Sequence, residues 1–199
     1  LESADALRIL ALLFGERRRP DRKSLEIDLG SGLQAWERFR EAVSRFVDVA
    51  SEEGRVGEAF VAAALDVAYP GAEVQMSKNH DPSFSAPGDV TVSSGGEPWL
   101  AAEARQKAQV TDDAVKFLDV AADRGVERVV FAALWNHQYR VGDINRVEAK
   151  RRAKESGVTI EVVDSPEELI DFVVRAGQGA LGDLASAFGE RMLERLQEQ

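Results

Sequence analysis

Six consecutive apolar residues in the second half of the chain constrain its fold more than any other feature. The run is Val129-Val130-Phe131-Ala132-Ala133-Leu134, and an uninterrupted apolar stretch of this length is typical of a strand that is covered on both faces. Amphipathic helix patterns stand on either side of it, over residues 111–124 and 143–156. Because a strand buried on both faces needs helices above and below it, the sequence predicts an α/β fold.

Four further strand patterns complete the predicted sheet. Three of them lie close together before the apolar run, at residues 73–78, 89–92 and 99–105, and one follows it at residues 158–162. The chain therefore reads as helix, three adjacent strands, helix, strand, helix, strand and final helices. This order predicts a mixed central sheet flanked by helices over residues 51–199, a length suited to one domain.

Residues 1–50 are predicted to form a helical annex packed on this core. They contain two amphipathic patterns that are separated by a charged break from Glu16 to Lys23.

Two helix starts carry recognisable caps. Thr111 is predicted to cap the helix over residues 111–124, and Ser165-Pro166-Glu167-Glu168 is a capping box that opens another helix.

The composition restricts the chemistry that is open to this chain. It has no cysteine and two histidines, which excludes disulfides, a thiolate nucleophile and a structural zinc site of the usual kind. Catalysis would therefore rest on carboxylates, Lys, Arg and a hard cation that they hold. Neither a signal peptide nor a membrane span is apparent, so we expect a cytoplasmic protein without a membrane partner.

The charge balance argues against nucleic acid as a partner. The chain carries 25 Lys and Arg against 35 Asp and Glu, a formal net charge of −10, whereas DNA-binding domains usually show a basic surface. The excess of negative charge falls in residues 51–199. Since the sequence begins at Leu1 rather than Met, it is consistent with further domains outside it that carry part of a binding surface.

Two acidic residues are brought together by the predicted hairpin of the second and third strands. The segments are Pro87-Gly88-Asp89-Val90-Thr91-Val92 and Leu100-Ala101-Ala102-Glu103-Ala104-Arg105-Gln106-Lys107. A hairpin centred on Gly96 sets Asp89 roughly opposite Glu103. Since side chains alternate along a strand, Arg105 and Lys107 lie on the same face as Glu103.

A pair of carboxylates beside cations suits phosphodiester hydrolysis assisted by a metal ion. Mg²⁺ takes oxygen ligands and keeps several of its waters, and Mn²⁺ is its usual substitute. Such an ion polarises the scissile phosphate and activates a bound water, while a neighbouring cation stabilises the charge of the transition state. No covalent nucleophile is needed, in keeping with a chain without cysteine.

These residues resemble the PD-(D/E)XK nuclease superfamily, whose motif is an Asp at the start of one strand and Glu-x-Lys on the next. Over about residues 55–165, Glu103-Ala104-Arg105-Gln106-Lys107 and its flanks resemble restriction endonucleases of the SacI type. The resemblance implies a restriction-endonuclease-like core and a Mg²⁺-dependent endonuclease that cuts DNA in a restriction or defence system. It also implies that Glu58, on the helix before the first strand, supports the metal held by Asp89 and Glu103.

The sequence departs from that motif where Arg105 replaces the Lys. Arg clamps a phosphate but cannot deprotonate to act as a general base, so Lys107 is the alternative source of the ammonium. Two hypotheses follow: an active endonuclease, for which a homodimer would suit the cutting of both strands, and a degenerate module that binds nucleic acid or a protein without cleavage. The plain alternatives are a surface ion pair between Glu103 and Arg105 and a helix-start role for Glu58.

Overall fold

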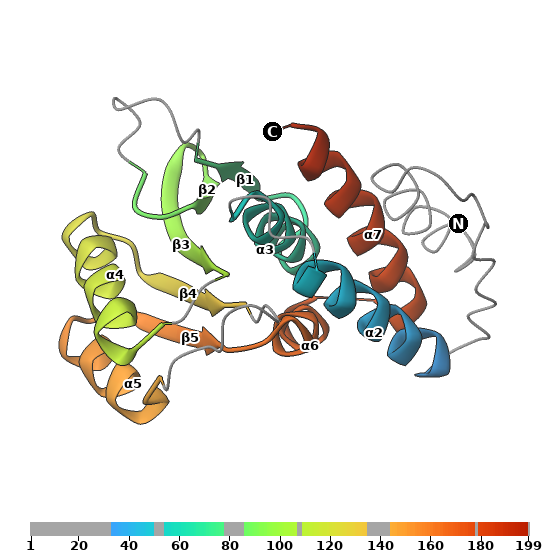
Figure 1. The fold of residues 1–199 in the computed structure, drawn as a ribbon. Coiled ribbons are helices and arrows are strands. Elements are labelled where there is room, and N and C mark those ends of the chain that lie inside the picture. The colour runs from blue at the N-terminus through green and yellow to red at the C-terminus, as the bar shows by residue number, and fades with distance from the viewer. Residues whose placement is uncertain are drawn as a thin grey trace.

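The computed structural model describes residues 33–49, 54–77, 86–106, 109–134, 144–177 and 179–198, and Figure 1 shows their arrangement. They form an α/β fold in which helices cover both faces of a central sheet. Within these residues no helix is both long enough and apolar enough to cross a membrane.

The sheet has five strands in the order β1-β2-β3-β4-β5. The first three are antiparallel to one another, and β3, β4 and β5 run parallel. This confirms the mixed sheet that the sequence predicts. The strands are β1 Glu73–Met76, β2 Val90–Ser94, β3 Glu97–Arg105, β4 Arg128–Ala133 and β5 Thr159–Val163.

Two layers of helices enclose the sheet, as Figure 1 shows. One face is covered by α4, Thr111–Asp123, and α5, Arg146–Glu155. The other face packs against a larger helical layer formed by α2 Leu33–Val49, α3 Arg55–Ala68, α6 Pro166–Ala176 and α7 Leu181–Gln197.

The alternation of side chains along β3 divides the interior into two clusters. Ala102 and Ala104 belong to the cluster beneath α3, whereas Ala101 belongs to the one beneath α4 and α5. Phe131, the β4 partner of Glu103, lies in the α4 and α5 cluster as well. The pleat of the sheet thus places Glu103 on the face that α4 and α5 cover.

The helix α3 is buried along nearly its whole length, which matches its apolar sequence on every face. The ring of Phe60 packs edge-on against Phe188 of α7, with ring centroids 5.3 Å apart. Phe39 of α2 contacts the same ring at 5.8 Å. Residues 33–49 of the predicted annex therefore pack into the same core as α3 and α7, while residues 1–32 lie outside the described residues.

Candidate functional site

The candidate site depends on the register of the β2–β3 hairpin. The strands pair Val92 with Leu100 and Val90 with Ala102, where the ladder ends, and the same register continued by one pair would set Asp89 opposite Glu103. Paired residues of antiparallel strands share a face of the sheet. The register on which the predicted pairing of these two acids depends is therefore the one that the structure has.

A bulge in β3 produces this register. The turn itself is tight, because Ser94 pairs with Glu97 and leaves only Gly95 and Gly96 between the strands, both at positive φ. From Val92 inward the register has shifted by one residue, so Trp99 is the extra residue of β3. Without this shift Asp89 would pair with residue 102 and its side chain would point to the opposite face of the sheet.

Asp89 is held in place by the backbone on both sides of it. Gly88 lies so close to β3 that a Cβ at this position would be 2.6 Å from the carbonyl oxygen of Ala102 and 2.9 Å from Phe117 of α4. The carbonyl of Asp89 accepts a hydrogen bond of 2.7 Å from the Ser77 amide, which extends the β1–β2 ladder. These contacts place Gly88 between β3 and α4, and Asp89 beside the end of β1.

The Asp89 carboxylate is partly buried and lies against the end of β3. Its Oδ2 accepts a hydrogen bond of 2.9 Å from the backbone N–H of Ala104. Burial raises the pKa of Asp89 above its ordinary value, and the Ala104 hydrogen bond and the positive charge of Arg105 partly oppose this rise. Because burial makes the ionised form of this carboxyl less favourable, a cation close to it would stabilise its negative charge.

Glu103 is buried in the sheet and forms an ion pair with Arg105, two residues along the same strand. Its side chain is 11% exposed, whereas that of Arg105 is 39% exposed. The ion pair that the sequence offered as the plain alternative is thus present. Only Arg105 of this pair lies at the surface, whereas Glu103 is buried. Because a buried carboxylate is costly without a partner, Arg105 compensates the charge of Glu103 in this state.

Glu58 lies in the first turn of α3, where it is buried. The amide of the neighbouring Gly57 donates a 3.0 Å hydrogen bond to the side chain of Gln106, directly after β3. The start of α3 is in this way attached to the same end of β3 that carries Glu103. Glu58 thus stands at the start of a helix that is attached to the end of β3. This position is compatible with both interpretations of Glu58, the helix-start acid and the support for a metal ion.

Gln106 is a residue of the site that sequence reasoning missed. Its buried amide accepts from the Gly57 N–H and donates to the carbonyl of Val47 at 3.0 Å, so it joins α2, α3 and the end of β3. The signal in the sequence was a polar side chain directly after a buried strand. Lys107, the next residue, lies outside the described residues.

The arrangement offers two carboxylates as ligands for a cation. Among the residues that the structure describes, no three His, Cys, Asp or Glu side chains lie close enough together to hold a metal ion. Asp89 and Glu103 each use one oxygen in the contacts above and keep the other outside any hydrogen bond within the described part of the chain. Two such oxygens fit Mg²⁺, which keeps several waters of its own. Glu58 does not form with them a group of three that could hold a metal ion.

The chain is similar to part of a known restriction enzyme, although no family model matches it. It is 34% identical over 107 residues to the type II restriction enzyme SacI of Streptomyces achromogenes, and the match covers 54% of this chain and 29% of that enzyme. The chain thus spans less than a third of the length of this relative. The similarity supports a relationship to restriction endonucleases, and the α/β fold with its mixed sheet is compatible with it.

Proposed function

We propose that this chain is the catalytic part of a Mg²⁺-dependent endonuclease of the PD-(D/E)XK type, which hydrolyses DNA phosphodiester bonds in a restriction or defence system. The observation that carries this proposal is the bulged register of β2 and β3, which, continued by one pair beyond Val90 and Ala102, sets Asp89 opposite Glu103 on one face of the sheet. The similarity to a restriction enzyme supports the same reaction and DNA as the substrate.

Each residue of the site has a role in this proposal. Asp89 and Glu103 bind the cation, which when bound polarises the phosphate and lowers the pKa of a water. Glu58 supports the site from the start of α3. Arg105 leaves Glu103 for the substrate and stabilises the negative charge that develops on the phosphate, a step for which its partly exposed guanidinium is accessible. Lys107 is the second candidate for this cationic role.

The DNA contacts are assigned to parts of the protein beyond this site. The chain has a net charge of −10, so its surface as a whole repels a polyanion. Loops, the segment before α2 or domains outside this sequence would supply the basic groups, and a homodimer would place two sites on the two strands. These assignments rest on the proposed reaction.

A second candidate function is a module that binds nucleic acid or a protein without cutting. The ion pair of Glu103 with Arg105 favours it, because this contact stabilises the buried acid without any metal. In this alternative the fold is retained while the metal site is lost. Binding of a divalent cation to the protein is the property that separates the two candidates.

The experiment is nicking of supercoiled plasmid with Mg²⁺ or Mn²⁺ by the wild-type chain and by Asp89→Ala. Asp123→Ala is the matched control, because it removes an exposed carboxylate from the last turn of α4, away from the site. We expect nicking by the wild type and the control and its loss in Asp89→Ala. Wild-type protein that neither nicks DNA nor binds Mn²⁺ in a titration would refute the endonuclease and favour the module.

Lys107→Ala, measured beside Arg105→Lys, separates the two candidates for the cationic role. If Arg105 stabilises the transition state, Lys107→Ala keeps the wild-type rate of nicking, and Arg105→Lys keeps or raises it, because Lys is the residue that the resembling motif has at this place. If Lys107 carries the role, the rate hardly changes in Arg105→Lys and falls in Lys107→Ala. The rate of nicking at saturating Mg²⁺ is the measurement.

A further inference from the structure

A pocket of about 380 Å³ lies on the face of the sheet opposite to the candidate site. The helical layer of α3 and α6 covers Ala132 and Val163 on this face, which are buried near the carboxyl ends of β4 and β5. At the amino ends of the same strands Arg128 and Thr159 are exposed. The pocket is therefore the part of the sheet face that the helices leave open.

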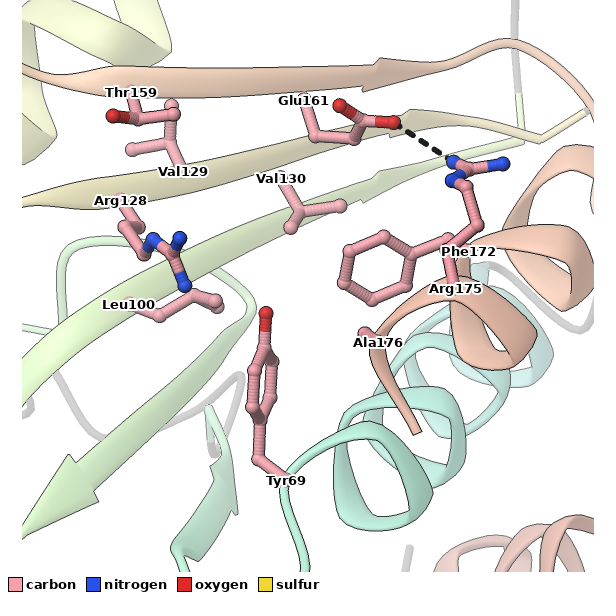
Figure 2. Close-up of a pocket in the computed structure, with 10 residues that line it drawn as sticks. All are labelled: Tyr69, Leu100, Arg128, Val129, Val130, Thr159, Glu161, Phe172, Arg175 and Ala176. Atoms are coloured by element: carbon pink, nitrogen blue, oxygen red, sulfur yellow. Dashed lines mark hydrogen bonds and ion pairs between the residues drawn. The ribbon is translucent and has the colours of Figure 1, made fainter. Parts of the chain in front are cut away.

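The floor of this pocket is apolar, whereas half of the residues that line it are polar or charged. Figure 2 shows Leu100 of β3 and Val130 of β4 beneath it, with the ring of Phe172 from α6 at one side. The ring of Tyr69, the residue that ends α3, stands at another side with its hydroxyl directed over the sheet. Small-molecule sites combine apolar surface with polar groups that orient the ligand, and the volume of this pocket lies within their usual range.

The Tyr69 side chain is fixed by its neighbours. Its ring packs edge-on against Trp99, with centroids 5.0 Å apart, and against Phe172 at 6.4 Å. Burial raises the pKa of Tyr69 above its ordinary value, with Arg128 opposing the rise and Glu161 adding to it. The hydroxyl is therefore protonated at neutral pH and available as a donor.

The charges at the edge of the pocket favour an anion. Glu161 and Arg175 neutralise each other in an ion pair of 2.9 Å at one side, drawn as a dashed line in Figure 2. Arg128, at the other side, makes no ion pair within the part of the chain that the structure describes. The pocket thus has one uncompensated positive charge, in a chain whose net charge is −10.

We propose that this pocket binds a small molecule that carries a carboxylate or a phosphate on a flat apolar body. Arg128 holds the anionic group through the two parallel hydrogen bonds that a guanidinium makes with such groups, and the Tyr69 hydroxyl donates a third. The apolar body lies on Leu100 and Val130 and against the ring of Phe172. This site is separate from the Asp89 and Glu103 pair, so it does not depend on the proposed nuclease function.

Titration calorimetry on the full chain tests the proposal with two probes, 2-naphthoate for a carboxylate and thymidine 5′-monophosphate for a phosphate. We expect at least one of them to bind with a dissociation constant of about 1 mM or lower, as for a small ligand of this size. The probe that binds more tightly identifies the source of the anionic group. The uncharged analogues, 2-naphthamide and thymidine, should bind about 10-fold more weakly or not at all.

Substitutions at the pocket decide whether the probes bind there. Arg128→Gln should weaken binding by about 10- to 100-fold, and Tyr69→Phe by about 3- to 10-fold, because each removes donors to the anionic group. Arg124→Gln is the matched control, an exposed Arg at the end of α4 that should leave the affinity unchanged. Failure of both probes to bind the wild type, or equal affinity of wild type and Arg128→Gln, would overturn the proposal.

Discussion

The close approach of Gly88 to β3 makes Gly88→Ala the sharpest test of how the candidate site is built. The added Cβ would lie 2.6 Å from the carbonyl oxygen of Ala102 and 2.9 Å from a ring carbon of Phe117. To reach an ordinary contact it must move away from that oxygen by roughly 1 Å. The oxygen belongs to the backbone of the central strand β3, so residue 88 and the adjacent Asp89 have to move instead.

Two consequences of this movement can be measured. Overpacking of this kind lowers the free energy of unfolding by about 1–3 kcal/mol, which urea denaturation followed by circular dichroism would report. A displacement of roughly 1 Å at Asp89 should also lower the rate of Mg²⁺-dependent nicking by about 100-fold. The loss of activity should exceed what the unfolded fraction explains, because most of the variant protein remains folded at room temperature.

Gly182→Ala is the matched control for this substitution. Gly182 lies in the first turn of α7, and a Cβ there would meet no atom within 4 Å apart from its chain neighbours and the backbone of its own helix, so the same chemical change meets open space. This variant should be as stable as the wild type or slightly more stable, because Ala favours a helix over Gly. If Gly88→Ala unfolds at the same urea concentration as Gly182→Ala and nicks DNA at the wild-type rate, the packing argument is wrong.

Three further predictions address the charges and hydrogen bonds around the core. Asp89→Asn should be more stable than the wild type at pH 7 without metal, because burial raises the pKa of Asp89 in the folded state. The stability that this carboxyl contributes is present below its ordinary pKa and is lost as the pH rises through the raised pKa. The difference in free energy of unfolding between the variant and the wild type should therefore vanish at about pH 3, as measured by urea titration. Gln106→Met should lower the free energy of unfolding by about 2–4 kcal/mol, since it leaves the Gly57 amide and the Val47 carbonyl without their partner. A free energy of unfolding within about 0.5 kcal/mol of the wild-type value would contradict this. Arg195→Lys should lower the free energy of unfolding by about 1–3 kcal/mol, measured by thermal unfolding, because Lys cannot keep the two hydrogen bonds of 2.8 and 2.9 Å to Asp66. Arg191→Lys, on the exposed face of the same helix, should change it by less than about 0.5 kcal/mol.

Local patterns predicted the order of the elements and the character of the sheet. The apolar run at β4 and the alternating segments before it identify strands because burial on one or both faces leaves a direct trace in the sequence. The Ser165 cap of α6 is confirmed by the 3.2 Å hydrogen bond from the Glu168 amide to the Ser165 hydroxyl, whereas the Glu168 carboxylate accepts from the Asp164 amide at 3.1 Å rather than from the Ser165 amide. A cap of this kind lies within four residues, so the sequence holds all of it.

Predictions failed or fell short where distant segments interact. Thr111 was predicted to cap α4, but it is the first residue of the helix, and the Asp113 carboxylate accepts from the Val110 amide at 2.9 Å instead. The Thr111 hydroxyl accepts a hydrogen bond of 2.9 Å from the amide of Asn145, the residue that caps α5. A partner 34 residues away leaves no local pattern. The same holds for Gln106, whose contacts lie on α2 and α3.

The register of the hairpin shows how a correct prediction can rest on a wrong local geometry. A turn centred on Gly96 predicts the pairing of residues 89 and 103, yet the turn has only Gly95 and Gly96 between paired residues, which alone would set Asp89 against Ala102. The bulge at Trp99 supplies the missing residue. Its ring packs on Tyr69, beneath α3, so the core on one face of the sheet fixes the register on which the proposed pairing of the two carboxylates on the other face depends. Packing around Trp99 is therefore a condition for the candidate site as much as the acidic residues themselves.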